Sequence, residues 1–270
     1  PGAGSAAQPP CAAREAAAKQ LVEMGHAALA ALQYGTKSTD AEIRTRSAAL
    51  LPQAKAAEWK HRADAYLADP DGKQKHDLPL LAEWDKLIGK PDAATRKLFA
   101  ELVRTNGEFL AAAADRANAA DVCAARCEAV FEKVKAPKGQ LNAEPGDLAA
   151  VLFVDSLAPT TITVRTQVVP AWLLRNPGLM EALDGKETGP AVRRLVVRWA
   201  EAQPTSNPVR PIALAEFADL ARKHPFPEAV PVLAKVAADK TTRGFLIQRL
   251  LAVEALGAVG GKEAAAALAE

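Results

Sequence analysis

Two cysteines, Cys123 and Cys127, lie one helical turn apart in this sequence. A pair of thiolates at that spacing could begin a metal site, but zinc takes four ligands and no His or further Cys lies nearby in the sequence. A disulfide between the two residues would require strained geometry within a regular helix. We therefore predict that both are small buried apolar residues, and that the chain holds no metal ion or other cofactor.

The other residue types that do acid–base or nucleophilic chemistry are scattered. General base catalysis depends on a partner placed beside the base. None of the four histidines has a second histidine four residues further on, and neither an HExxH nor a Gly-x-Ser-x-Gly motif occurs. We predict surface or packing roles for these histidines and find no motif of an enzyme. The histidines are His26, His61, His76 and His224.

Two short segments have the composition of ligand-binding loops. Residues 257–262 are rich in glycine and end in Lys, but a phosphate-binding loop needs wider glycine spacing, a preceding strand and a hydroxyl residue where Glu263 stands. Residues 69–72 resemble the start of a calcium loop, but the glycine comes two positions too early and the final Glu is absent. Both segments are predicted to be turns at helix ends.

A basic cluster offers the clearest candidate for binding. Residues 160–250 contain thirteen Lys and Arg against eight Asp and Glu. Arg193, Arg194 and Arg198 fall on adjacent turns of one expected helix, with Trp199 beside them. Such a face could bind phosphates or an acidic peptide, but acidic residues interrupt it, so an ion-paired, solvated helix face is favoured over a nucleic-acid site. The interrupting residues are Glu201, Glu216 and Asp219.

A sequence pattern recurs three times along the chain and marks expected helices. It consists of Arg, any two residues, a small residue, any three residues and then Leu. The three copies are Arg14, Ala17 and Leu21; Arg44, Ser47 and Leu51; and Arg249, Ala252 and Leu256. The first two arginines are thirty residues apart, close to the length of one two-helix unit of an α-solenoid. Asp40 is expected to cap the helix of the second copy, with Ile43 as its first buried residue and Arg44 exposed.

The segment Asp40-x-x-Ile43-Arg44 resembles the Asp-x-x-Val-Arg signature of HEAT-like repeats, including the short bacterial subtype named after phycobilisome lyases. The resemblance covers residues 12–51 and, less closely, 228–268. Pro10 stands where an Asp is expected before Arg14. The middle of the chain resembles uncharacterised HEAT-associated proteins of planctomycete bacteria, which implies no activity. The resemblance implies that the Arg of each copy ties neighbouring repeats together by hydrogen bonds.

Composition supports an all-α fold. Nearly half of the 270 residues are apolar, only 5% are aromatic, and Ala, Leu and Val dominate the apolar set. Alanine is the best helix former and lets helices approach closely. The net charge of +2 gives no general case for nucleic acid, and no apolar run approaches the roughly twenty residues of a membrane span. Three cysteines argue against a disulfide framework, and the cellular compartment stays open.

Proline and glycine divide the predicted α-solenoid into segments. We expect a disordered leader at 1–10, HEAT-like repeats at 11–67 with a helix break at Pro52, and an irregular helical middle at 68–135. A linker is expected at 136–147, and residues 148–270 should be helical and end in HEAT-like repeats, apart from an extended loop at 160–164. The last helix, from Lys262, has no visible partner, so the natural protein is expected to continue.

The four tryptophans are expected to pack between helix layers, either in the core or half-buried. Stacked helix pairs leave a groove that binds other macromolecules. We predict a non-enzymatic protein-interaction scaffold whose contacts include Arg44, Arg193, Arg194, Arg198 and Trp199, with a protein as the partner. A nucleic-acid-binding solenoid that uses residues 160–250 is the alternative. A third possibility is an enzyme whose pocket collects residues from distant repeats.

Overall fold

The computed structural model is helical throughout the part that it describes, residues 11–89, 91–134, 145–158, 164–205, 207–239 and 246–269. Within these residues it has fourteen α-helices, one short 3-10 helix and no β-strand, which confirms the predicted all-α class. The predicted leader, residues 136–144 of the predicted linker and residues 160–163 of the predicted loop lie outside this part. No described helix is both long and apolar enough to cross a membrane.

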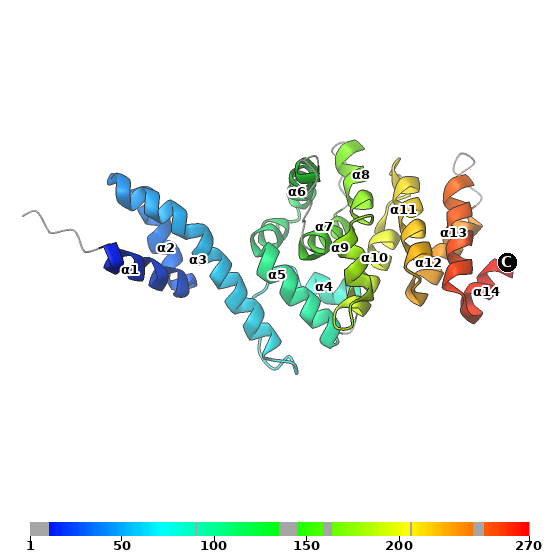
Figure 1. Ribbon diagram of the computed structural model, residues 1–270, viewed down its shortest axis with the longest axis horizontal. Coiled ribbons are helices and arrows are strands. Elements are labelled where there is room, and N and C mark those ends of the chain that lie inside the picture. Colours follow the sequence, from blue (N-terminus) through cyan, green and yellow to red (C-terminus); the bar gives the residue numbers. More distant parts are fainter. Residues whose placement is uncertain are drawn as a thin grey trace, which may run out of the picture. The chain divides into compact units, whose positions relative to one another are not determined.

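The chain divides into two compact units, residues 1–76 and 77–270, hereafter unit 1 and unit 2. Unit 1 contains α1 (Cys11–Glu23), α2 (His26–Gly35) and α3 (Ala41–Leu67), drawn in blue in Figure 1. Gly25, between α1 and α2, has φ of 51°, a left-handed conformation that strains any residue with a side chain. Asp40 caps α3 as predicted, because its carboxylate accepts hydrogen bonds from the backbone N–H groups of Glu42 and Ile43.

Two sequence predictions for α3 are wrong. The helix continues through Pro52 without a break. Pro52 and Ala48 are both exposed, so water can satisfy the Ala48 carbonyl that lacks its usual N–H donor. Ile43 is 50% exposed rather than buried. The helix face that packs against its neighbours passes through Ser47, Ala54, Ala63 and Tyr66 instead.

Small residues let α2 and α3 cross closely. Gly35 ends α2 and is buried against Ser47 of α3. A Cβ atom at position 35 would lie 2.9 Å from the Ser47 Cβ and closer still to its Oγ, which is too close for any real contact. Ser47 is the small residue of the second repeat copy, so the pattern selects a small side chain where two helices touch.

Glu58 of α3 fixes the start of α2. Its carboxylate accepts hydrogen bonds from the backbone N–H of His26, at 3.0 Å, and from Arg62 Nε, at 2.6 Å. Burial by itself raises the pKa of Glu58, but the hydrogen bonds from Arg62 and His26 outweigh it and hold the pKa below its ordinary value. The side chain therefore supplies an acceptor for an N–H group that a helix cannot satisfy from within.

The segment after α3 forms the predicted turn. The buried Asp69 carboxylate accepts hydrogen bonds from the backbone N–H groups of Gln74 and Lys73 and lies 3.0 Å from His76 Nε2. The Gln74 N–H, then His76 and the Lys73 N–H, outweigh burial and lower the pKa of Asp69 to about 2. The Asp69 carboxylate thus holds the turn in place.

Unit 2 contains the remaining helices, and most of them match the helices expected from the sequence. Pro145, Gly146 and Asp147, predicted to belong to a linker, lie in the first turn of α7. The helices are α4 (Leu81–Ile88), α5 (Ala93–Ala113), α6 (Ala119–Val134), α7 (Pro145–Leu157), α8 (Val164–Leu173), α9 (Pro177–Asp184), α10 (Gly189–Ala202), α11 (Arg210–Lys223), the 3-10 helix η1 (Pro227–Ala229), α12 (Val230–Ala238), α13 (Leu246–Val259) and α14 (Gly261–Ala269).

The core of unit 2 lies between α4, α5 and α7. Every residue from Leu148 to Val154 of α7 is buried, as its apolar sequence predicts. Trp84, Phe99 and Phe153, one from each of the three helices, are fully buried, and the Trp84 ring meets the Phe153 ring edge-on with 5.1 Å between centroids. This aromatic cluster holds the helices against each other.

A kink at Asn106 divides α5. Asn106 has non-helical backbone angles, with φ of −130°, and is buried. Its side-chain oxygen accepts a hydrogen bond from Arg126 of α6, and Arg126 also contacts the Asp147 carboxylate at the start of α7. The kink therefore brings α5, α6 and α7 together through one guanidinium group.

The contacts of unit 2 run mainly between helices close in sequence. α5 packs on α6 and α7, α7 on α10, and α13 on both α11 and α12, as the successive colours in Figure 1 show. Arg249 of α13, the arginine of the third repeat copy, donates a hydrogen bond to the Ala237 carbonyl at the end of α12. Ala252 and Leu256 of the same copy are fully buried.

Candidate functional site

Helix α4 presents a polar face because its apolar face is anchored in the core. Trp84 and Ile88 are buried, with Trp84 in the aromatic cluster. Glu83, Lys86 and Leu87 lie at other angles around the helix and line a groove on the surface of unit 2. The position of these three side chains therefore follows from the burial of Trp84.

The groove has a volume of about 550 Å³ and collects side chains from four parts of unit 2. Besides α4, these are the segment after α5, the end of α7 and the end of α10. Both α7 and α10 end here, so their terminal carbonyl groups carry partial negative charge close to the groove. The lining residues are Glu83, Lys86, Leu87, Arg116, Ser156, Leu157, Arg198, Glu201 and Ala202.

Charges of both signs face this groove. Arg116 lies 3.4 Å from Glu83, and Arg198 lies 2.7 Å from Glu201. Lys86 is exposed and has no ionic partner within the part of the chain that the structure describes. Two ion pairs and one further ammonium group leave the groove with an excess of one positive charge.

A buried hydrogen-bond network fixes α10 against α7 beneath the groove. Trp199 Nε1 donates to the Asp155 carboxylate at 2.7 Å. Gln203 Nε2 lies 3.3 Å from the same carboxylate and 3.3 Å from the Trp199 carbonyl. All three side chains are buried. Trp199 is only 1% exposed, so it presents no surface to a partner, and this corrects its predicted place among the contact residues.

The structure separates the predicted contact arginines. Only Arg198 lines the groove. Arg193 contacts Glu228 and donates to the Leu183 carbonyl, whereas Arg194 donates to Asp92, the residue that caps α5. Burial by itself raises the pKa of Asp92, but hydrogen bonds from Thr95 and Arg194 leave it below its ordinary value. Both arginines thus connect helices within unit 2.

Arg44, the predicted contact in unit 1, also bonds within its own unit. Its guanidinium donates a hydrogen bond of 2.7 Å to the Ser38 carbonyl in the turn before α3. Arg14, the matching arginine of the first copy, instead contacts Glu42 of α3 at 3.0 Å. The three pattern arginines therefore all bind neighbouring segments, two through backbone carbonyls and one through a carboxylate.

The other residues that the sequence analysis considered as possible sites contribute to the structure of the fold. Cys123 and Cys127 are fully buried, and their mutual hydrogen bond, followed by burial, raises the pKa of the Cys123 thiol. His224 lies beside Asp184, at 3.3 Å. Gly257 lies inside α13, and Gly260 and Gly261, where the chain passes from α13 into α14, both have positive φ. No three His, Cys, Asp or Glu side chains of the described residues are arranged to hold a metal ion.

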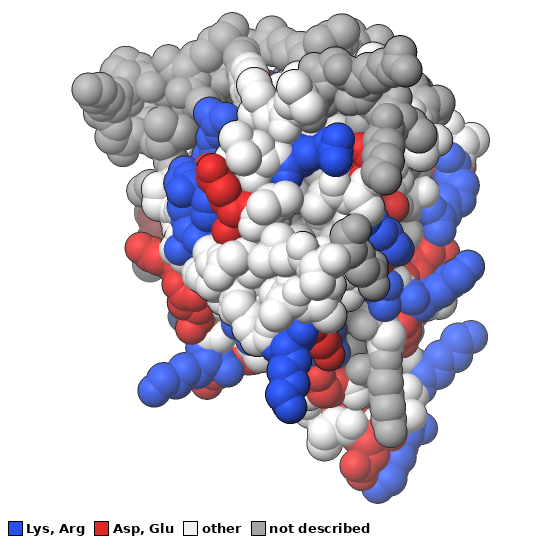
Figure 2. Space-filling model, turned by 90° about the vertical axis from the view of Figure 1, so that its right-hand side faces the viewer, with Lys and Arg blue, Asp and Glu red and all other residues white. Residues whose placement is uncertain are grey.

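A second surface lies at the end of unit 2 formed by α13 and α14. Leu246 and Ile247 are each 72% exposed and Leu250 is 59% exposed. Figure 2 shows this end of the molecule, where uncharged residues cover much of the face. Val253 of α13 lines the same surface, and Leu268 of α14 is also exposed.

Sequence reasoning missed the contribution of α4 to the groove. The sequence analysis gave Glu83, Lys86 and the later Arg116 no role. The spacing of Glu83, Lys86 and Leu87, at positions i, i+3 and i+4, does indicate a shared helix face. Trp172, expected in the core or half-buried, has a side chain that is 45% exposed.

Comparisons with protein-family models, with curated proteins and with solved structures found no match to this chain. Its function is therefore argued from the geometry of the groove and of the helices that form it.

Proposed function

We propose that this chain is a protein-interaction scaffold built on a HEAT-like α-solenoid, and that the groove of unit 2 is a contact surface for a protein partner. The observation that carries the proposal is the open groove of about 550 Å³ in which four segments present both acidic and basic side chains. Recognition by side chains spread over several helices is the mode that helical repeat proteins use.

The helix arrangement of unit 1 supports a repeat architecture. Arg14 of α1 contacts Glu42 near the start of α3, and Leu21 packs against the cluster that contains Ala54, together with Leu50. Successive residues of α1 thus meet successive residues of α3, so the two helices run in the same direction. That is the arrangement expected when the first helix of one pair stacks on the first helix of the next.

The charges of the groove define the chemistry of the proposed partner. Lys86 and Arg198 favour an acidic side chain, and Leu87 and Leu157 supply apolar contact beside them. Because the ion pairs at the rim are exposed, they contribute little to affinity by themselves and act mainly in specificity. A short acidic segment with one aliphatic residue is the ligand that this groove fits best.

Partner capture with charge-reversed variants tests the proposal. The full chain and the Lys86→Glu/Arg198→Glu variant are used to isolate partners from the native host, and a photo-reactive residue at position 87 cross-links what occupies the groove. We expect one stoichiometric protein that cross-links to the unaltered chain and is lost with the variant. The control is Lys262→Glu, which also replaces a positive charge with a negative one but at an exposed position on α14. Equal capture by both variants contradicts the proposal.

Nucleic-acid binding remains the alternative use of residues 160–250. The structure gives it no added support, because Arg193, Arg194 and Arg198 each lie against a carboxylate that compensates their charge. Phosphate contacts make binding strongly dependent on salt. A duplex gel shift that weakens steeply with salt and is reduced by Arg194→Glu would favour nucleic acid over a protein partner.

A further inference from the structure

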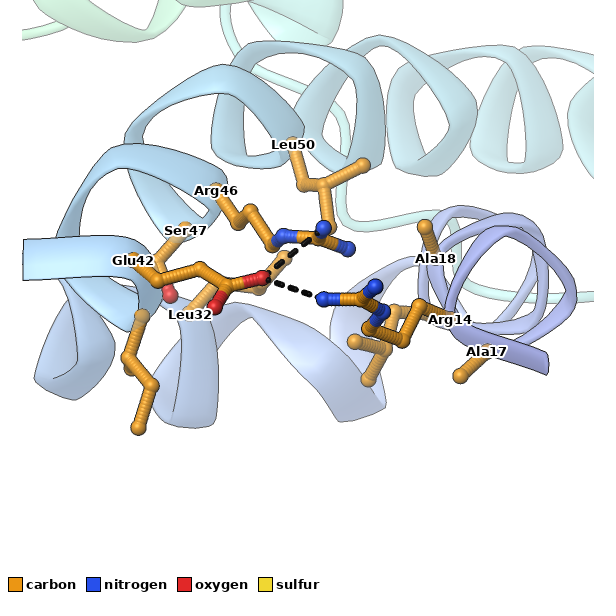
Figure 3. A pocket seen from close by; sticks show the side chains of 10 residues that line it. Arg14, Ala17, Ala18, Leu32, Glu42, Arg46, Ser47 and Leu50 are labelled. Atoms are coloured by element: carbon orange, nitrogen blue, oxygen red, sulfur yellow. Dashed lines mark hydrogen bonds and ion pairs between the residues drawn. The ribbon is translucent and has the colours of Figure 1, made fainter. Parts of the chain in front are cut away.

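Unit 1 contains a second cavity, separate from the groove of unit 2 and outside its proposed function. It lies between α1 and α3 above α2, has a volume of about 450 Å³ and is shown in Figure 3. This volume is within the usual range for small-molecule sites. The lining residues are Arg14, Ala17, Ala18, Leu21, Leu32, Glu42, Ile43, Arg46, Ser47 and Leu50.

The charged side chains of this cavity form a single cluster. Arg14 and Arg46 lie 3.0 Å and 2.9 Å from the same oxygen of Glu42 (Figure 3). Because α1 and α3 run in the same direction, this cluster occupies one end of the cavity. The walls beyond it are aliphatic and extend to Leu21 and Leu50. The cavity is therefore cationic at one end and apolar along its length.

The cationic end has unused hydrogen-bonding capacity. The Nε of Arg14 is buried and has no hydrogen-bond partner. Leaving a buried donor unsatisfied is costly, particularly in a charged group. The two guanidinium groups also share one carboxylate, so the cluster of Arg14, Arg46 and Glu42 carries one excess positive charge. A second carboxylate placed here would accept a hydrogen bond from this donor and would be attracted by the excess positive charge.

We propose that this cavity binds an aliphatic monocarboxylate, with its carboxylate at Arg14 and Arg46 and its tail along the aliphatic walls. A carboxylate is the group that both arginines already hold, in the form of Glu42. From Arg14 to Leu21 is seven residues of helix, or about 10 Å, which sets the length of tail that the cavity covers. An extended octanoyl to decanoyl chain matches this length, and longer chains would project beyond it.

Titration calorimetry of the full chain with octanoate, decanoate and dodecanoate tests the inference. Burial of each added methylene group is expected to raise affinity about fourfold until the tail outgrows the cavity. The dodecyl trimethylammonium ion, which has a similar tail and the opposite charge, should bind much more weakly. No carboxylate binding below the micellar concentration, or equal binding of both head-group charges, overturns the proposal.

Three variants and one control locate the ligand. Arg46→Met should weaken dodecanoate roughly tenfold by removing a charged donor. Glu42→Gln should tighten binding, because it removes the carboxylate that competes for the two arginines. Ala17→Leu fills the aliphatic part of the cavity and should abolish binding with little cost to helix formation. Lys60→Met removes one exposed positive charge elsewhere on α3 and should change nothing.

Each alternative result is informative. Loss of affinity in Glu42→Gln, or unchanged affinity in Arg46→Met, would show that the ligand does not use the cluster. Displacement of dodecanoate by an acidic amphipathic peptide at lower concentration than dodecanoate itself would identify the cavity as a peptide site and overturn the small-molecule assignment. Circular dichroism of every variant checks that α1 to α3 remain folded. Because the cavity lies in unit 1, none of these results bears on the groove of unit 2.

Discussion

Substitution of Gly35 by alanine should separate α2 from α3. The added Cβ would lie 2.9 Å from the Ser47 Cβ and closer to its Oγ. Rotation of the Ser47 side chain moves only the Oγ, so the contact between the two Cβ atoms remains and the helices must shift. Overpacking of this kind costs about 1–3 kcal/mol. The gain in helix propensity from Gly to Ala, at most about 1 kcal/mol, offsets only part of that cost.

Hydrogen exchange measured by mass spectrometry on the full chain gives the stability that α2 and α3 alone lose in Gly35→Ala. After the gain in helix propensity is subtracted, the net loss is about 2 kcal/mol at the upper end, which corresponds to exchange roughly 30-fold faster for the amides of α2 and α3. Amides of α11 and α13, in unit 2, should keep their wild-type rates. Gly257→Ala is the matched control, because a Cβ there meets nothing within 4 Å, and it should slow exchange in α13.

A second substitution at position 47 decides whether the reasoning is right. Ser47→Ala in the Gly35→Ala background removes the Oγ only and should restore part of the protection. Ser47→Gly removes the Cβ as well and leaves the nearest atom, Ile43 Cγ2, at an ordinary 3.7 Å. It should therefore restore most of the protection despite its poorer helix propensity. Unchanged exchange in Gly35→Ala, or equal rescue by both second substitutions, refutes the close approach of α2 and α3.

Three further outcomes are expected. Pro52→Ala should stabilise α3 by about 1–3 kcal/mol in urea unfolding, since it supplies the missing N–H donor in mid-helix; no gain would mean that α3 breaks there. Trp199→Phe should cost about 1.5–3 kcal/mol more than Trp84→Phe, because it also removes the hydrogen bond to the Asp155 carboxylate. The stability that Asp69 contributes should be complete above about pH 4, its unfolded pKa, and lost as the pH falls towards its folded pKa of about 2; Asp69→Asn should remove that part of the pH dependence.

Much of the secondary structure could be predicted from local chemistry. Asp40 caps α3, Gly25 and Gly89 adopt positive φ next to helices, and Asn106 interrupts α5, because each effect depends on a residue and its immediate neighbours. Pro52 was predicted wrongly for the complementary reason. A single missing hydrogen bond is a local cost, and the packing of a 27-residue helix outweighs it.

The candidate sites were predicted less completely than the helices. Arg198 was expected at a contact surface and does line the groove, whereas Trp199, one residue further on, is buried by its bond to Asp155. Trp199 and Asp155 are 44 positions apart in the sequence, and no local pattern indicates that they pair. Lys86 reaches the groove from α4 and Arg116 from the segment after α5, and neither could be selected without knowing which segments meet.

The sequence by itself determined that the chain is helical, where most of its helices begin and end, and that small residues recur at a fixed offset after an arginine. These properties depend on backbone propensity, capping and side-chain size within a few residues. Only the tertiary structure decided which helix faces are covered. Leu246, Ile247 and Leu250 have the residue types of a core yet remain exposed, and the arginine cluster meets an aliphatic cavity only because α1 and α3 run in the same direction. Burial depends on what neighbouring helices provide, and that is a property of the assembled fold.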